Sequence, residues 1–248
     1  KILLDGIPLI DRGATKQSLS QLDVNSIERV EIVEGPMSVV YGTDALAGVI
    51  NIITKKGDGY SEENTWRVGA RVQEESMGKE YDFFKDKGLH NESIDLGFNH
   101  KSGLFVNGGY TRNNHGGWQG DLTGREKRWH PKDQALMNGM FGFQNRNMNV
   151  WYRLDFLDEK IFGPNNGSEL QPEKVSDKDF LTKRYTHQLQ SDWKLDNRLD
   201  VHAALSYQDY KRRTRTTESD LSTGEKWLSS AEASQDITQY KAWIARAT

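Results

Sequence analysis

Six side chains between residues 113 and 134 have the chemistry of a binding site. They are two imidazoles, two indoles and two guanidinium groups: His115, Trp118, Arg125, Arg128, Trp129 and His130. Imidazoles ligate haem iron and other metals, guanidinium groups attract anions, and indoles stack on flat ligands. The two histidines are fifteen residues apart, which is not the spacing of a local metal site. The segment is therefore either part of a ligand-binding mouth or a solvated loop without a ligand.

The sequence contains none of the residue patterns that are typical of enzymes. The chain contains no cysteine, its carboxylates show no recognisable paired spacing, and it has no nucleophile elbow or phosphate-binding loop. We therefore expect no enzymatic activity, no catalytic residues, no bound metal and no cofactor. Lys and Arg total 33 against 36 for Asp and Glu, so the basic excess that favours nucleic-acid binding is missing.

The candidate loop joins segments in which apolar and polar residues alternate. Between positions 148 and 156, for example, every second residue is apolar, and Asn149, Arg153 and Asp155 lie between them. A period of two predicts β-strands with one apolar face. The same count applied from residue 66 onward predicts about eight strands. The longest uncharged stretch, at 134–145, is twelve residues, well short of the length of a transmembrane helix.

Short and long connections alternate between these strands. Three are turns of about three residues, at 101–103, 145–147 and 196–198. Four are long loops, at 76–91, 113–134, 159–182 and 214–236. Short periplasmic turns and long extracellular loops are typical of outer-membrane β-barrels, whereas a compact soluble domain rarely contains four such loops. The connections therefore predict antiparallel transmembrane β-barrel strands.

A basic cluster lies where the last long loop begins. Lys211, Arg212, Arg213 and Arg215 fall near the expected extracellular rim. Such a cluster can attract an anionic chelate, or it can pair with lipopolysaccharide phosphates or with nearby acids.

The first 57 residues lack the long alternating segments, and their pattern of short apolar runs, turns and helix caps predicts a small α/β unit. Short apolar runs flank Asp5-Gly6, a turn dipeptide, and the β-branched run at 48–54 predicts a further strand. A strand is also expected at 30–33. Helical turns are expected at 26–29, capped by Asp23 or Asn25, and at 37–41.

Three runs in this unit resemble the plug domain of TonB-dependent outer-membrane receptors. They are LDGIPL at 4–9, SIERVEIVEGP at 26–36 and VYGTDALAGVINIITK at 40–55. The residues expected to shape the plug are Gly35, Pro36, Tyr41, Gly42 and Gly48. The VINIIT ending resembles siderophore, haem and cobalamin receptors. SusC-like importers usually carry Asn-Gly-Val-Ile there, which Ala47-Gly48 does not match.

The resemblance implies a division of the chain. Residues 1–57 would be the C-terminal part of a plug, 58–65 a linker, and 66–248 the first strands of the barrel. Plugged barrels of this class have 22 strands, so about eight strands make up roughly a third of one. We therefore expect the chain to be a fragment of a longer receptor.

The implied function is energised import across the bacterial outer membrane. The resemblance implies a TonB energy-coupling complex as partner and a small chelated ligand: a ferric siderophore, haem or cobalamin, in that order of preference. Outer-membrane lipid and lipopolysaccharide would surround the barrel. Two alternatives remain open: a SusC-like glycan or peptide importer with a surface lipoprotein partner, and a soluble β-rich adhesin or carbohydrate-binding module.

Overall fold

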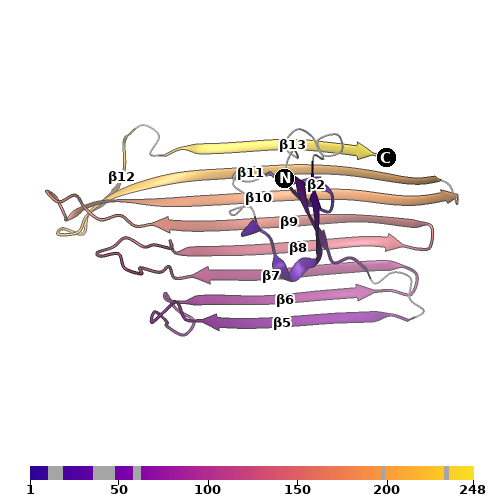
Figure 1. Ribbon diagram of the computed structural model, residues 1–248, viewed down its shortest axis with the longest axis horizontal. Helices are drawn as coiled ribbons and strands as arrows, with labels where there is room; N and C mark the ends of the chain where they lie inside the picture. Colours follow the sequence, from indigo (N-terminus) through magenta and orange to yellow (C-terminus); the bar gives the residue numbers. More distant parts are fainter. Residues whose placement is uncertain (11–18, 36–47, 58–62, 197–198, 232–234) are drawn as a thin grey trace.

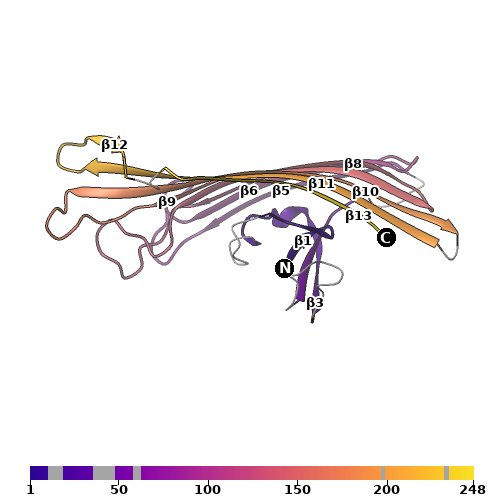
Figure 2. The same ribbon diagram turned by 90° about the horizontal axis from the view of Figure 1, so that it is seen from above.

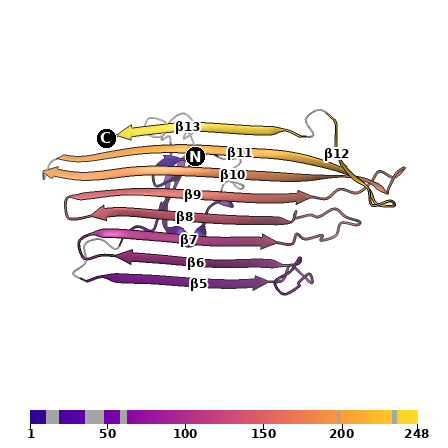
Figure 3. The ribbon, with the colours of Figure 1, turned by 180° about the vertical axis from the view of Figure 1, so that it is seen from behind.

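The computed structural model describes residues 1–10, 19–35, 48–57, 63–196, 199–231 and 235–248. It consists of a wide sheet of long strands and a small sheet that lies against one face of it (Figure 2). We call the face that carries the small sheet the inward face and the opposite face the outward face. The long strands run side by side in chain order across the wide sheet (Figure 1), and Figure 3 shows the same order from behind.

The wide sheet is antiparallel throughout. Its strands are β5 (Thr65–Glu75), β6 (Leu89–Asn99), β7 (Leu104–His115), β8 (Lys132–Gln144), β9 (Met148–Gly163), β10 (Lys174–Asp196), β11 (Leu199–Asp220), β12 (Lys226–Leu228) and β13 (Ile237–Ala247). Each pairs with its neighbour in the chain, except that β13 pairs with β11 alongside the three-residue β12. The eight long strands confirm the prediction of about eight barrel strands.

Alternation accounts for the two faces of this sheet. Ten large apolar side chains are exposed on the outward face: Trp66, Val68, Val72, Ile94, Leu96, Val106, Phe141, Leu189, Leu205 and Trp243. Nine polar side chains are buried on the inward face: Thr111, Gln134, Arg153, Glu159, Thr182, Arg184, Thr186, Gln188 and Gln208. The sheet therefore inverts the arrangement of a water-soluble protein, in which apolar groups are buried and polar groups exposed.

The strands extend further than the apolar pattern predicts. The connections observed are 76–88, 116–131, 164–173 and the segments on either side of β12, all shorter than the loops expected at 76–91, 113–134, 159–182 and 214–236. β10 and β11 stay paired from Lys174↔Asp220 onward, and the end of β11 in this pairing is polar on both faces. Cross-strand pairing continues there without a contrast between the faces, so alternation could not reveal it. The turn at 145–147 is as predicted, and most of 196–198 lies outside the described residues.

The small sheet has the order β2-β1-β4-β3. Its strands are β1 (Ile2–Leu4), β2 (Ile7–Pro8), β3 (Ile27–Glu34) and β4 (Gly48–Thr54), and β1 and β4 are parallel. Asp5 and Gly6 both have positive φ, 49° and 79°, as expected of the turn dipeptide between β1 and β2. Ile2, Leu4, Leu22 and Ile52 form its apolar core.

The helical turn predicted at 26–29 is wrong. A 3-10 turn, η1 (Val24–Ser26), precedes it, and the Asp23 side chain accepts a hydrogen bond from the Asn25 backbone N–H. From Ile27 the chain forms β3, because pairing with β4 satisfies its backbone along the whole strand. The turn predicted at 37–41 lies outside the described residues.

No helix in the described part of the chain is long and apolar enough to cross a membrane.

Candidate functional site

Four glutamines on the inward face hold the small sheet by its backbone. Gln188 and Gln190 on β10 donate to the carbonyl oxygens of Leu4 and Asp5, at 3.2 and 2.7 Å. On β11, the Gln208 amide group donates to the Pro8 carbonyl at 2.6 Å and accepts from the Ile10 N–H at 2.9 Å. Gln134 on β8 donates to the Ser20 carbonyl at 2.9 Å. These four glutamines thus recognise the path of the backbone rather than particular side chains.

Arginines add further contacts of the same kind. Arg184 donates to the Gln21 carbonyl at 2.8 Å, and Arg246 on β13 donates to the Gly6 carbonyl at 3.3 Å. Arg153 lies in an ion pair with Asp155 at 2.6 Å and reaches the Ser26 hydroxyl at 3.2 Å. These contacts come from β9, β10 and β13, so they fasten the small sheet to the C-terminal half of the wide sheet.

Asp23 is the main side-chain anchor of the small domain. One carboxylate oxygen accepts from the Thr111 hydroxyl at 2.9 Å, and the other accepts from the Asn138 amide at 2.9 Å. The same carboxylate caps η1. Asp23 therefore joins the local turn to β7 and β8.

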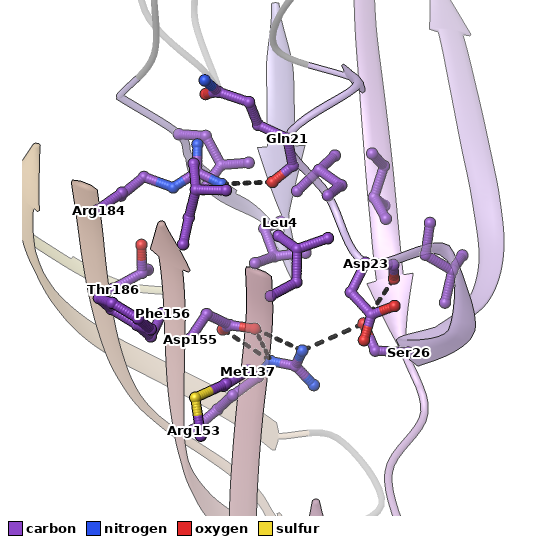
Figure 4. Close-up of a pocket in the computed structure, with 16 residues that line it drawn as sticks. Leu4, Gln21, Asp23, Ser26, Met137, Arg153, Asp155, Phe156, Arg184 and Thr186 are labelled. Carbon is purple, nitrogen blue, oxygen red and sulfur yellow. Dashed lines mark hydrogen bonds and ion pairs between the residues drawn. The ribbon is translucent and has the colours of Figure 1, made fainter. Parts of the chain in front are cut away.

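A small cavity separates the two sheets beside these contacts. Figure 4 shows Arg153, Asp155 and Ser26 on one side of it, with Arg184 and the Gln21 backbone on the other. Its volume is about 20 Å³, close to the 10–15 Å³ that one water molecule needs. A chelated nutrient does not fit there, so the cavity belongs to the interface and is not a ligand site.

The contact between the sheets leaves several polar atoms without a protein partner. Among the described residues these include Thr186 Oγ1, Gln188 Oε1, Ser206 Oγ and Tyr210 OH, which lie on adjacent positions of β10 and β11. Such groups form hydrogen bonds with water where it has access. Because the interface is polar, separating the two sheets exposes hydrogen-bonding groups that water can satisfy. The attachment is therefore specific, and its hydrogen bonds can be exchanged for bonds to water.

The structure brings together three of the six predicted binding residues. Trp118 and Trp129 pair through their backbones at 2.9 and 3.0 Å, and their rings lie 5.3 Å apart between centroids. The His115 ring lies 6.1 Å from that of Trp129. His115 ends β7 next to an open groove of about 260 Å³ that also contacts Lys132 and Lys160. These three residues form what we call the aromatic cluster.

The imidazole of the aromatic cluster is held neutral. We call the part of the outward face that is formed by exposed apolar side chains the apolar band. His115 lies beyond this band, because the outward-facing residues next to it are Asn114 and Asp133. Burial lowers the pKa of His115, and the charge of Lys132 lowers it further. Its Nδ1 accepts a hydrogen bond from the Gly117 N–H at 2.8 Å. The ring is thus neutral near pH 7, with one nitrogen already engaged.

The other three predicted residues do not join this cluster. Arg125 forms a two-pronged ion pair with Asp177, at 3.0 and 2.6 Å, and so ties the loop to β10. Arg128 pairs with Asp121 within the loop at 3.1 Å. His130 lies against Gly163 at the end of β9. Both arginines are thus engaged in ion pairs. In the described part of the chain no three His, Asp or Glu side chains gather as a metal site would require.

Two of the predicted plug residues lie in the described part. Gly48 begins β4 with φ +131°, and a Cβ there would lie 2.6 Å from the Val33 carbonyl oxygen, so only glycine fits. Gly35 follows β3 with φ +105° and has open space around it. Pro36, Tyr41 and Gly42 lie outside the described residues.

The four glutamines and three arginines of the inward face were not predicted as site residues. Their only signal in the sequence is their position on the polar side of the alternation, at 188, 190 and 208 for example. That pattern places them on the inward face but does not show what they contact.

The fold and these contacts define a barrel wall with a plug held against it. Residues 1–49 match the family model described as the TonB-dependent Receptor Plug Domain. The chain is also similar in fold to three solved structures. They are the unliganded ferric citrate transporter FecA (TM-score 0.55, 14% identity, 99% of this chain and 44% of that one), the copper transporter OprC (0.55, 11%, 99% and 45%) and the open form of the ferric-catecholate import receptor Fiu from E. coli K12 (0.52, 14%, 99% and 49%).

At these identities the likeness to solved structures concerns the fold, and the chain spans less than half the length of each of the three. Residues 1–49 belong to the TonB-dependent receptor plug family, and the sheet that follows is part of a barrel of the kind these receptors have.

Proposed function

We propose that the chain belongs to an importer of a scarce, chelated nutrient across the bacterial outer membrane, driven by the TonB energy-coupling complex. The observation that carries the proposal is the plug sheet fastened to the polar inward face of a wall whose outward face is apolar. An apolar outward face is stable in lipid, and a closed antiparallel sheet is one of the two structures that can cross it. The reaction is binding and transport, with no bond made or broken.

The plug attachment supports a gate that opens. Each of the hydrogen bonds from the glutamines and arginines contributes about 1 kcal/mol, and all of them can be replaced by water. A pull from the periplasmic side could therefore shift the plug without unfolding the wall.

The finer part of the proposal is the class of ligand. Ferric siderophores come first, ahead of haem and cobalamin, because the VINIIT ending resembles receptors of this group and two of the structures similar in fold are named for ferric chelates. The aromatic cluster of His115, Trp118 and Trp129 offers rings to a flat or catecholate ligand, and His115 also lines the groove of about 260 Å³.

Uptake by the full-length protein tests the proposal. The protein is expressed in a Gram-negative host lacking its own outer-membrane iron receptors, and accumulation of radiolabelled ferric chelates, haem, cobalamin and copper is measured. The matched control is the same host without TonB. We expect accumulation of a ferric chelate in the first host and none in the second.

Two results would count against the proposal. Accumulation that is equal with and without TonB removes the energy coupling. Recovery of the protein as a soluble species without detergent removes the membrane location and favours the adhesin alternative.

A further inference from the structure

The inward face carries a small apolar cluster on three adjacent strands. Phe105 of β7, Met140 of β8 and Trp151 of β9 pack together there, and each is at most 2% exposed. Gly142 lies between Phe105 and Trp151 in the register, and a Cβ on it would come within 2.5 Å of the Phe105 ring. Large apolar side chains on a wall of this kind are stable only where they are shielded from water.

Lys56 and Gly57, which follow β4, cover this apolar cluster. The Lys56 ammonium lies 5.1 Å from the centroid of the Trp151 ring. Gly57 runs so close to Phe105 that a Cβ on Gly57 would lie 2.7 Å from the ring. A cation is attracted to the face of an indole, and the attraction grows when water is excluded. The chain thus leaves the small sheet with a cation resting on the wall.

The same ammonium is held in place by the first turn of the small sheet. Lys56 Nζ forms an ion pair with Asp5 Oδ1 at 2.9 Å, and the Asp5 side chain is only 2% exposed. The Asp5 carboxylate also accepts from the Thr54 N–H at 3.0 Å and from the Thr54 hydroxyl at 2.7 Å. Asp5 therefore fixes the long Lys56 side chain, which otherwise has many rotamers, over Trp151. We call Lys56, Asp5 and Trp151 the clamp.

The clamp differs from the other contacts between the two sheets in how it responds to water. Arg184 donates to the Gln21 carbonyl at 2.8 Å, and water can replace a bond of this kind. Water cannot replace the cover over the apolar cluster. Exposing three large apolar side chains costs several times as much free energy as exchanging one such hydrogen bond. The clamp is therefore the firmest attachment of the plug.

The clamp also lies at one end of the contact between plug and wall. On β9, Glu159 follows Trp151 by eight positions (151 to 159) and accepts from the Gln21 side chain at 2.9 Å. At about 3.3 Å per residue, the two positions are roughly 26 Å apart along the strand. The plug can therefore release at the Gln21 end while it stays attached at Trp151.

We propose that Lys56 is a positioning residue for transport. Paired with Asp5 and seated on Trp151, it keeps the end of the plug on the wall while the part around Gln21 tilts away and admits the nutrient. The role in transport rests on the proposed function. The attachment itself is measured without a nutrient and without TonB.

Two cysteines introduced into one strand of the full-length protein report on the two ends of the plug. Leu136→Cys lies in β8 beside Gln21 and the small cavity, and Met140→Cys lies in the apolar cluster; the native side chains are 4% and 2% exposed. The chain has no cysteine of its own. The protein is placed in lipid vesicles, and the rate of reaction with a small charged methanethiosulfonate measures how often each end opens. The parent protein is the blank.

The thiol of Leu136→Cys should react about 10-fold faster than that of Met140→Cys. Lys56→Met keeps the aliphatic part of the side chain but loses the cation. It should speed the reaction at Met140→Cys about 10-fold and change that at Leu136→Cys by less than about 2-fold. The matched control is Lys55→Met, because the native Lys55 lines a separate cavity beside η1. It should change neither rate.

Two results overturn the clamp. One is an equal rate at the two cysteines in the otherwise native protein, and the other is equal acceleration of both by Lys56→Met, which indicates general loosening of the plug. A second pair of variants gives the same test if Lys56→Met does not fold. Trp151→Phe keeps a ring beneath the ammonium and should protect Met140→Cys, whereas Trp151→Leu should not; equal protection would show that the ring does not hold the cation. If the rates are as expected but TonB-dependent uptake is missing, only the proposed function is contradicted.

Discussion

The two faces of the wide sheet are made from alternate residues of the same strands, yet they attach to their surroundings by opposite means. The inward face holds the plug through directional hydrogen bonds, such as those from Gln188 and Gln190 to the Leu4 and Asp5 carbonyls. The outward face offers side chains such as Leu96 and Leu205, whose burial in lipid needs no direction. A shift of one residue in register would exchange the two faces, so alternation alone carries both functions.

This difference teaches where the wall tolerates change. On the inward face the position of each donor matters and its polarity is required. Among the apolar side chains of the outward face polarity is not tolerated, but for a surface proposed to meet fluid lipid the exact shape of each apolar group is of little consequence.

The largest expected effect comes from removing inward donors. In Gln188→Leu/Gln190→Leu the two plug carbonyls lose these donors, at a cost of about 1–3 kcal/mol each. The plug should open more often, which hydrogen exchange of the Asp5 amide, bonded to the Ile52 carbonyl at 2.8 Å, would report. Gln239→Leu is the matched control, because Gln239 donates to Asp209 on the outward face. Equal exchange in both variants would show that the glutamines do not hold the plug.

The next effect comes from placing a charge on the outward face. Leu96→Arg should destabilise the folded protein in lipid vesicles by about 2–4 kcal/mol, as measured by urea unfolding. The control is Ser93→Arg on the same strand, which faces inward onto a groove of about 230 Å³. If the two variants unfold alike, the outward face does not meet lipid.

A smaller effect is expected from replacing two glycines of the plug, which tests whether close packing at Gly48 stabilises the plug sheet. Gly48→Ala forces a Cβ to within 2.6 Å of the Val33 carbonyl and also strains a φ of +131°. Gly35→Ala strains φ alone, since nothing lies within 4 Å of its Cβ. We expect losses of plug stability of about 2–3 and about 1 kcal/mol respectively, measured by hydrogen exchange in β4. Identical losses would remove the role of close packing at Gly48.

The smallest effect lies where β11 extends beyond both the plug and the apolar band. The Asp220 carboxylate accepts from the Ser222 hydroxyl, then from the Thr223 and Ser222 N–H groups, and these bonds lower the pKa of Asp220 below its ordinary 3.8. The stability they provide is present above that ordinary value and is lost as pH falls through the lowered pKa. Exchange of the Thr223 amide should therefore speed up only in strong acid. In Asp220→Asn this step should be missing; its persistence would assign it to another group.

The sequence was informative where the two faces differ and uninformative where they do not. Alternation at 148–156 predicted β9 and its faces, because the outward face is apolar there and the inward face, which meets the plug, is polar. The end of β11, up to Asp220, is polar on both faces. Alternation therefore did not predict that the strand extends this far. The helical turn at 26–29 was wrong because pairing of β3 with β4 outweighs a local cap.

The candidate site was predictable only in part. Trp118 and Trp129 belong to one loop, so their proximity in the sequence made a contact between them predictable. Arg125 looked free because its partner, Asp177, lies 52 residues away. The glutamines on β10 and β11 reach plug carbonyls 184 to 200 residues distant, and the spacing of polar residues carries no information on such pairs.

Because the glutamines bind carbonyl oxygens of the plug, the plug and the wall can evolve partly independently. Every residue type presents the same carbonyl, so substitutions at Leu4, Asp5 or Pro8 leave the acceptors of these bonds unchanged. A plug with the same backbone course that keeps its side-chain anchors, such as Asp23, meets the same wall even where its other side chains differ. Plug and wall can therefore diverge at different speeds, and a plug exchanged by recombination between related genes would arrive in a barrel that already fits it.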